Sequence, residues 1–468
     1  MKTYKVFYLF TISIFAVLLL PTLVQDGMFL DGVTYSSISK NLSNGIGSFW
    51  KPHYTRILYP EFYEHPPLVF GIQSLFFSVL GDGIYTERIF TLLTAILTAV
   101  GIILNWHLFT ESKDIKRFAW IPVLLWISIP LVFWSYQNNL LENTLGVFTI
   151  FSIYFISKAL FQQRILYLIP GSILVVLAFF SKGFVGLFPI VAVPIYYLAL
   201  EQKSKITGII YGFVSLILPI SLIYLIFLLS PEAKVNFGHY IHQQLIPALS
   251  NQREITTENH LWILSKLIIE LSLPIIIVIA LFIRQIKIKL SIDKTYNRIG
   301  IYFILLGISA SFPLIISLKQ RAFYLIPSIP FFILGISFLI LPFLKFLETL
   351  SKPIVLWINR LAVVILLFTS IYSIFNIGKY SRDEAKLRDI YTLSKHIPNQ
   401  TIIQTTPKIW NDWAFVAYMS RIGDLSLDTD NEHTYYLCLK NDKVFNGIDE
   451  KYTKLELDLK LYVLLKQK

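Results

Sequence analysis

The chain has 468 residues, of which 55% are hydrophobic and 15% are charged, whereas soluble domains average roughly 25% charged residues. Its mean hydropathy of +0.62 excludes an ordinary soluble enzyme. The net charge of +12 is compatible with nucleic-acid binding, but the lysines and arginines stand mainly in short links between apolar runs. That placement favours membrane topology as their cause and predicts no nucleic-acid partner.

The apolar runs predict an α-helical polytopic membrane protein in contact with a lipid bilayer. A spanning helix needs about 20 mainly apolar residues. The first run, Val6 to Val24, is not followed by a small-residue cleavage site, so it predicts an uncleaved helix rather than a signal peptide. By the same measure the sequence predicts eleven spans, at residues 5–24, 87–108, 118–136, 141–160, 165–181, 184–200, 206–229, 261–283, 299–318, 322–341 and 354–375.

The links between these spans alternate in charge. Positively charged links stay in the cytoplasm, and the basic residues that define this side are Lys2, Lys5, Lys113, Lys116, Arg117, Arg164, Lys203, Lys205, Arg284, Lys287, Lys289, Lys294, Arg298, Lys345 and Lys352. The opposite side then carries two long loops, at 25–86 and 230–260. An odd number of spans places the N-terminus inside and residues 376–468 outside.

The apolar segment Pro67–Leu80 is predicted not to span. Its roughly 14 residues would extend about 21 Å as a helix, short of the roughly 30 Å hydrocarbon core. A twelfth span here would also move the basic link 284–298 to the outside. The segment therefore predicts a juxtamembrane helix at the outer interface, with Phe70, Phe76 and Phe77 dipping into the bilayer.

The tail changes composition at about Ser381. A charged helical stretch is followed by two runs typical of β-strands, Thr401–Gln404 and Thr434–Leu439, and by a turn signal at Asn446-Gly447. This pattern predicts a transmembrane domain over residues 1–380 and a small extracytoplasmic α/β domain over residues 381–468. Cys438 is the only cysteine, which excludes an intrachain disulfide.

Charged residues near the predicted spans are candidates for function, because such charges are costly in a membrane. On the predicted outer side they are Asp26, Asp31, Glu142, Lys182, Lys319 and Arg321. A lone aspartate in a long loop is more often an ordinary solvated residue, and a lysine or arginine at a helix end often snorkels to the interface. However, three basic residues in short outer links oppose the usual charge bias, and a lipid phosphate is the ligand they would suit.

Other candidates are weaker. His65, beside Pro66, is equally consistent with a packed histidine, and Arg253 and His260 in the second long loop carry less signal still. The sequence has no phosphate-binding P-loop, no HExxH, no CxxC, no GxSxG and no zinc-site spacing. We therefore assign no metal site and no cofactor, although a divalent metal is possible. Acidic residues together with a basic cluster suit activation of a hydroxyl and recognition of a phosphate leaving group.

The chain resembles the membrane glycosyltransferases of the GT-C fold, and most closely their bacterial branch related to dolichyl-phosphate-mannose protein mannosyltransferases and the lipid A aminoarabinose transferase. The most specific part is the first outer loop, where Asp31-Gly32-Val33-Thr34-Tyr35 leads to Glu64-His65-Pro66-Pro67-Leu68 and then to Arg88 at the start of the next span. Ser181-Lys182-Gly183 is similar to the family's Thr/Ser-Lys-Gly element. Lys319-Gln320-Arg321, through Tyr324 and Pro327, is similar to its later Tyr-x-x-Pro element.

The resemblance implies roles for individual residues. Asp31 matches the essential first-loop acid, and Glu142 matches a second acid that is usually Asp. His65 stands where many members have a Lys near the lipid phosphate, and Gly32 stands where others have Glu. The family also implies an inverting transferase that takes a sugar from a polyprenyl phosphate, with Lys182, Lys319, Arg321 and His65 at the donor phosphate.

The leading hypothesis is thus a hexosyl- or pentosyltransferase at the outer face of the bacterial inner membrane. A transporter or flippase of a polyprenyl-linked glycan is the alternative, since Pro219, Pro274 and Pro327 fall within predicted spans. A transporter should place its charges near the bilayer midplane, often on broken helices. The acceptor hydroxyl stays open between a protein, lipid A, a growing glycan and an arabinan-like polymer.

Overall fold

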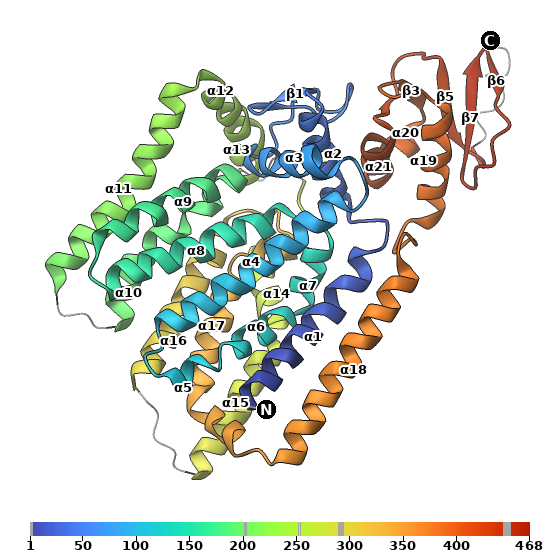
Figure 1. Ribbon diagram of the computed structural model, residues 1–468. Helices are drawn as coiled ribbons and strands as arrows, with labels where there is room; N and C mark the ends of the chain where they lie inside the picture. The colour runs from blue at the N-terminus through green and yellow to red at the C-terminus, as the bar shows by residue number, and fades with distance from the viewer. Residues whose placement is uncertain (1–2, 201–203, 251, 253, 289–293, 443–450) are drawn as a thin grey trace.

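The computed structural model describes residues 3–200, 204–250, 252, 254–288, 294–442 and 451–468. Lys2, Lys203, Lys289, Arg253 and the predicted turn at Asn446-Gly447 lie outside these residues. Long apolar helices dominate the fold (Figure 1): α1 (Thr3–Leu23), α4 (Thr86–Leu108), α8 (Leu141–Phe161), α11 (Lys205–Leu229), α16 (Lys294–Ser311) and α18 (Lys352–Asn376). The chain is a multi-pass membrane protein, as predicted.

Within the described residues, seven helical stretches are long and apolar enough to span a membrane, or up to nine if each of two bent pairs is one span. The bent pairs are Lys113–Ile127 with Pro130–Gln137, at 77°, and Trp262–Glu270 with Ser272–Leu281, at 59°. They contain α5 (Lys113–Lys116), α6 (Trp120–Ile127), α7 (Pro130–Gln137), α14 (Trp262–Glu270) and α15 (Ser272–Ile288). The sequence predicts eleven spans, two more than the upper of these counts, which considers only the length and composition of helices among the described residues.

Two features account for the difference. The predicted spans 165–181 and 184–200 belong to one helical stretch, Ile165–Leu200, made of η1 (Ile165–Tyr167), α9 (Leu168–Lys182), η2 (Gly183–Val191) and α10 (Ala192–Leu200). The predicted span 322–341 is the shorter apolar helix Ile329–Leu344, formed by α17 (Ile329–Ile340) and the start of η6 (Leu341–Thr349), after η4 (Phe312–Ile316) and η5 (Ala322–Leu325).

The stretch Ile165–Leu200 folds back on itself. Gly183, with φ +75°, adopts a backbone conformation that other residues rarely take. A side chain at Gly186 would lie 2.5 Å from the backbone of Ala178. Eight residues of a straight helix extend about 12 Å, so the chain must reverse between these two positions. Lys182 lies at this reversal.

Shorter elements gather at one end of the helix bundle (Figure 1), which we call the domain end. They include α2 (Leu30–Ser43), the hairpin of β1 (Gly47–Ser48) and β2 (Lys51–Pro52), α3 (Leu68–Leu80), α12 (Pro231–Tyr240), the π-helical η3 (Ile241–Leu245) and α13 (Ile246–Leu249). As predicted, α3 is a separate helix too short to span.

The prediction for the side chains of α3 was wrong in part. Phe70 and Phe77 are buried in the protein, where Phe70 packs against Phe62 and Tyr35. The apolar residues that α3 exposes are aliphatic, namely Leu75, Val79 and Leu80, at 64%, 82% and 48%. The larger aromatic side chains thus fill the protein core, and smaller aliphatic ones remain for contact with lipid.

The tail forms a small α/β domain. A five-stranded sheet of order β4-β3-β5-β7-β6 is built from β3 (Ile402–Thr405), β4 (Ser426–Asp428), β5 (Tyr435–Leu439), β6 (Tyr452–Lys454) and β7 (Tyr462–Gln467). The helices of this domain are α19 (Glu384–His396), α20 (Pro407–Trp410) and α21 (Trp413–Gly423). The predicted strands correspond to β3 and β5. The core of this domain also takes in Met28 and Val33, beside and within α2.

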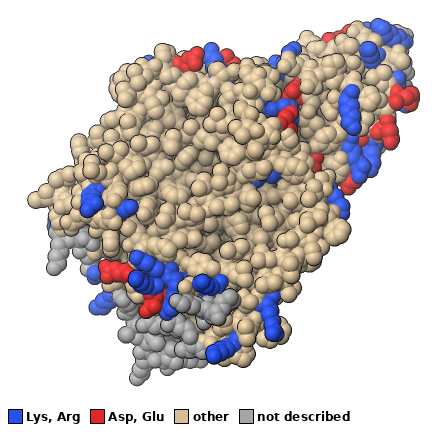
Figure 2. Space-filling view, in the orientation of Figure 1, with Lys and Arg blue, Asp and Glu red and all other residues tan. Residues whose placement is uncertain are grey.

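Charged side chains are distributed unevenly over the surface. In the face shown in Figure 2, Lys and Arg gather at the lower end of the molecule and charges of both signs cover the C-terminal domain, while the broad middle is almost free of charge. In Figure 1, α1 begins at that lower end and runs beside α18, which leads to the C-terminal domain at the other end. The uncharged belt is the surface that a bilayer would surround.

Candidate active site

Asp31 lies in the first turn of α2, at the domain end. A carboxylate is favoured there by the helix dipole. No local side chain caps the N-terminus of α2. Instead, Asn138 Oδ1, from a distant part of the chain, accepts a hydrogen bond from Phe29 N at 2.8 Å. Asn138 follows α7 and precedes α8, the helix that carries Glu142. Asp31 and Glu142 are therefore brought together by two segments that contact each other directly.

Glu142 and Lys182 form a buried ion pair. Glu142 lies in the first turn of α8 and its side chain is 1% exposed, while Lys182 is the last residue of α9 and is 12% exposed. Glu142 Oε1 accepts the hydrogen bond from Lys182 Nζ, whereas Glu142 Oε2 is buried without a hydrogen-bond partner. The ammonium of Lys182 also lies 4.4 Å from the centre of the Tyr324 ring, at cation–π distance.

The charges around Asp31 act on its pKa. Burial raises the pKa of the Asp31 carboxyl to about 6, and the negative charge of Glu142 adds to this effect. The positive charges of Lys182 and Arg321 lower that pKa, and Glu64 raises it slightly. Burial and like charge thus outweigh the cations, which is typical of a carboxylate kept available as a base.

Tyr35 and His65 form a support beside Asp31. Tyr35 is buried one helical turn after Asp31, and its hydroxyl lies 3.2 Å from His65 Nε2. The ring of His65 packs against Tyr35 and Phe62. Glu64, the neighbouring residue, accepts hydrogen bonds from Tyr59 at 3.3 Å and Gln244 at 3.1 Å. His65 is thus a packed histidine on the same side of the molecule as the carboxyl groups of Asp31, Glu64 and Glu142.

The loop between η4 and η5 brings further cations. The Arg321 guanidinium pairs with Glu254 at 3.1 Å, and both side chains are exposed. The backbone N–H of Lys319 donates to Ser317 Oγ at 3.0 Å. Tyr324 follows in η5, and its ring lies against Lys182. The basic link and the Ser-Lys-Gly element, far apart in sequence, therefore meet at one place.

Two of the weaker candidates have structural roles. Arg88 is buried, and its guanidinium donates to the backbone carbonyls of Gln137 at 2.9 Å and Gly27 at 2.5 Å, which ties α4 to both neighbouring segments. His260 Nδ1 lies 2.7 Å from the carbonyl of Ile315. Arg253 lies outside the described residues. Among those that are described, no three His, Cys, Asp or Glu side chains form a group that could hold a metal ion.

Sequence reasoning missed two sets of neighbours. Glu64 was quoted only as part of the His-Pro-Pro-Leu element, although a carboxylate directly before His65 was a usable signal. Asn138 and Asn139 precede Glu142, and both hold α2: Asn139 Nδ2 donates to Ser36 Oγ at 3.0 Å. Paired asparagines in a short link indicate a turn, but which helix they bind cannot be read from that signal.

Comparisons with known proteins found one family model and several solved structures that are similar to this chain. Residues 64–227 match the family model described as dolichyl-phosphate-mannose-protein mannosyltransferase. This range contains His65, Glu142 and Lys182, and it ends before the loop of Arg321. No curated protein matches the chain.

Solved structures match over nearly the whole length. ArnT from Cupriavidus metallidurans bound to undecaprenyl phosphate has a TM-score of 0.63 at 14% identity and covers 98% of this chain and 97% of its own. The same protein in the apo state has a TM-score of 0.62 at 13% identity, covering 97% and 95%. The oligosaccharyltransferase AglB from Archaeoglobus fulgidus, in complex with an inhibitory peptide and a dolichol phosphate, has a TM-score of 0.51 at 11% identity, covering 94% and 70%.

These two kinds of match contribute different information. The solved structures are too distant in sequence to carry more than the fold, which is that of the GT-C proteins. The family model adds the enzyme class over the segment that holds Glu142 and Lys182. The chain is therefore a multi-pass membrane glycosyltransferase of the GT-C fold.

Proposed function

We propose that this glycosyltransferase moves a sugar from a polyprenyl phosphate to a hydroxyl of a protein, lipid or glycan, with inversion at the anomeric carbon. The single observation that carries the proposal is the gathering of Asp31, Glu142 and Lys182 from three separate segments at the domain end. The matched family is described by a dolichyl-phosphate-mannose donor, and ArnT of the same fold holds undecaprenyl phosphate. Both support a polyprenyl phosphate donor here.

The reaction is one displacement. The acceptor oxygen forms a bond to the anomeric carbon while the bond from that carbon to the phosphate oxygen breaks, and the bonding electrons leave with the polyprenyl phosphate. The hydroxyl proton passes to the Asp31 carboxylate, whose raised pKa suits a general base. Lys182 and Arg321, with Lys319 on the same loop, stabilise the negative charge that grows on the phosphate.

The remaining residues orient these groups. Glu142 holds the Lys182 ammonium at the site and supplies a second negative charge next to Asp31. Tyr324 packs under that ammonium, and His65 packs against Tyr35 on the helix that bears Asp31. These charges lie at the ends of helices rather than in their middles, which is the arrangement expected for surface chemistry rather than for a midplane transport site.

We further propose that the domain end faces the outside of a bacterial inner membrane. The opposite end carries basic residues, including Lys113 and Lys116 of α5, which the positive-inside rule places in the cytoplasm. Reporter fusions after Lys113 and after Lys468 should read inside and outside, respectively. Fusions that report the same side would contradict this orientation.

The proposed activity is tested with purified protein in nanodiscs. Polyprenyl phosphates bearing different sugars are supplied with an extract of cellular lipids and glycans, and free polyprenyl phosphate is measured. We expect release that depends on the acceptor extract and is lost in Asp31→Asn. Movement of an intact polyprenyl-linked glycan between leaflets, without release, would instead support a flippase. Mass spectrometry of lipid A and glycans from cells with and without the gene then identifies the acceptor.

A further inference from the structure

The C-terminal domain touches the segment that leads into α2. Helix α21 lies along α2 (Figure 1), and its Tyr418 is buried. The Tyr418 hydroxyl accepts a hydrogen bond from Met28 N at 2.8 Å and donates to Met28 O at 2.7 Å, with Asp383 Oδ2 at 3.3 Å as a second acceptor. Met28 stands three residues before Asp31. One side chain of the C-terminal domain therefore fixes the backbone just ahead of the proposed base.

The same helix holds α2 further along. Ser37 and Ser420 hydroxyls lie 2.6 Å apart, and both side chains are buried. Ser420 also donates to the carbonyl of Tyr54 at 3.2 Å, in the loop beyond α2. Tyr418, Ser420 and Arg421 of α21 thus contact Met28, Ser37 and Lys40, at three points from just before α2 to its last turn.

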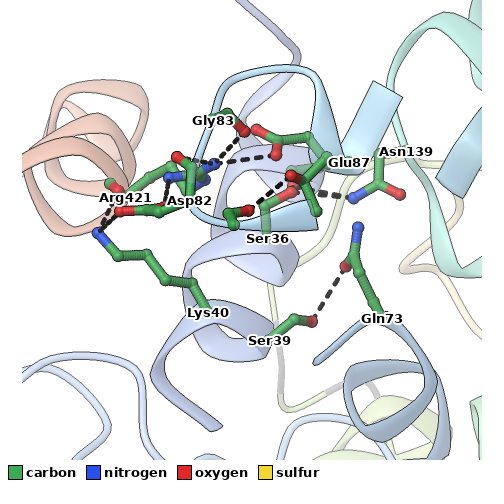
Figure 3. Close-up of polar contacts among 12 residues, drawn as sticks. Ser36, Ser39, Lys40, Gln73, Asp82, Gly83, Glu87, Asn139 and Arg421 are labelled. Atoms are coloured by element: carbon green, nitrogen blue, oxygen red, sulfur yellow. Dashed lines mark hydrogen bonds and ion pairs between the residues drawn. The ribbon is translucent and has the colours of Figure 1, made fainter. Parts of the chain in front are cut away.

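An ion-pair network, largely buried except for the half-exposed Asp82, completes the contact at the far end of α2 (Figure 3). Lys40 Nζ lies 2.9 Å from Asp82 and 3.0 Å from Asp424, and it donates to the carbonyl of Arg421 at 3.0 Å. Arg421 in turn pairs with Asp82 at 2.6 Å and Glu87 at 3.0 Å. The side chains of Lys40 and Arg421 are only 4% and 7% exposed.

Helix α3 and the link between α7 and α8 hold α2 from outside the C-terminal domain. Asn138 accepts from Phe29 N, Asn139 donates to Ser36, and Gln73 of α3 accepts from Ser39 at 3.0 Å. The helix is thus fixed between two surfaces. The C-terminal domain supplies Lys40 with two of its partners, Asp424 and the Arg421 carbonyl, and Met28 with the Tyr418 hydroxyl. Losing them would leave buried polar groups short of partners, which is unfavourable.

We propose that the C-terminal domain sets the position of the catalytic carboxylate, with Tyr418 and Arg421 as positioning residues that act through α2 on Asp31. The inference rests on the proposed function for the role of Asp31. The domain is then part of the catalytic machinery, although none of its residues need touch the donor. A carboxylate held by both surfaces can meet the acceptor hydroxyl in one orientation, and such placement contributes much of the rate in enzymes.

The first test measures the contact itself. Tyr418→Phe keeps the packed ring and removes only the hydroxyl. Its matched control is Tyr452→Phe, since Tyr452 is also buried in this domain and donates to Gln404 and His433 without touching α2. We expect faster hydrogen–deuterium exchange over residues 28–43 in Tyr418→Phe and no change there in Tyr452→Phe. Equal exchange in both variants and the wild type would overturn the proposal.

The second test measures turnover on full-length protein in nanodiscs. In Tyr418→Phe we expect kcat to fall roughly tenfold or more while the KM for donor stays unchanged, because misplacement of about 1 Å can cost up to about 100-fold. Arg421→Lys, which keeps a cation but cannot bridge both Asp82 and Glu87, should show a smaller fall in kcat than Arg421→Ala. A purely structural role would lower the active fraction and leave kcat per folded molecule at the wild-type value, which would overturn the proposal. If the wild type transfers no sugar, the proposed function fails, and the exchange experiment still decides whether the contact holds α2.

Discussion

Helix α2 has a charged cluster at each end, and the two clusters differ in how their charges are compensated. At the Lys40 end, each of Lys40, Asp82, Glu87, Asp424 and Arg421 has an oppositely charged partner within 3.0 Å. At the other end, burial and the nearby carboxylates raise the pKa of Asp31 to about 6, despite the cations Lys182 and Arg321.

This difference separates a charge that stabilises from a charge that reacts. A well-paired buried network keeps its groups in one charge state and one geometry, so it suits the attachment of a domain. Ionising a buried carboxyl is unfavourable, so its ionised form takes up a proton more readily than an exposed carboxylate does. Active sites often hold such groups even though they lower the stability of the fold. Each of the following variants tests one side of this contrast.

The largest effect is expected for Asp31→Asn. Loss of a general base typically lowers turnover about 10²–10⁴-fold, and we expect this fall in kcat with donor binding retained. The folded-state pKa of Asp31, about 6, lies above its usual value of 3.8, so its ionised form destabilises the fold at neutral pH. The variant should therefore be at least as stable as the wild type in thermal denaturation.

Asp26→Asn is the matched control, five residues away. Asp26 accepts hydrogen bonds from Tyr391 at 2.7 Å and from Gly27 N at 2.7 Å, and it belongs to the contact between the first loop and the start of the tail. This variant should keep much of its activity and lose some stability. Full activity in Asp31→Asn would remove Asp31 as the base and make Glu142 the next candidate.

At the paired end, Arg421→Ala should mainly lower stability. Removing one partner of a buried ion pair typically costs about 3–5 kcal/mol, here because buried Glu87 loses its cation, whereas Asp82 keeps Lys40. Lys451→Ala is the control in the same domain, since its ion pair with Glu432 is exposed on both sides and solvent screens such pairs. Thermal denaturation in detergent should separate the two variants, and equal melting temperatures would show that the network is not stabilising.

The two basic residues near Asp31 should differ in their effect on donor binding. Lys182 is buried against Glu142, whereas Arg321 is exposed and paired with exposed Glu254. A charge-assisted hydrogen bond is worth about 1.5–3 kcal/mol, so Lys182→Ala should weaken donor binding roughly 10- to 100-fold. Arg321→Ala should weaken it only a few-fold, and less at high salt, because solvent screens exposed charges. A larger effect at Arg321 would reverse the assignment of the main phosphate contact.

The sequence predicted the helical membrane class and both tail strands because apolar length and alternation are local signals. Hydropathy was less informative where a helix bends or reverses, because it carries no signal for that geometry. The predicted span 118–136 is divided into α6 and α7 at Pro130. Proline has no backbone N–H for a helix hydrogen bond and disfavours a helical conformation in the residue before it. The reversal at Gly183 keeps two predicted spans in one helical stretch, and nothing in hydropathy distinguishes that from two separate helices.

The site was predicted unevenly for a similar reason. Glu142 and Lys182 stood out because a charge in a short apolar link is unusual. The Lys40 network gave no such signal, since Lys40 and Arg421 are 381 residues apart. Their pairing arises only when the C-terminal domain packs on α2. Charges of ordinary appearance in sequence can thus become buried partners through long-range packing alone.

The last and smallest effect concerns pH. Asp31 must be ionised to accept the hydroxyl proton, and its pKa is raised to about 6. Activity should therefore be nearly full at pH 7 and fall as the pH drops through 6, about tenfold per unit below it. Glu142→Gln should move this limb to lower pH, because Glu142 raises the pKa of Asp31, and Lys182→Met should move it to higher pH. The control is His65→Gln, since a histidine titrates in the same range. If the fall in kcat at acid pH persists in His65→Gln and shifts in the other two variants, Asp31 is the titrating group. If this fall disappears in His65→Gln, the titrating group is the His65 imidazole.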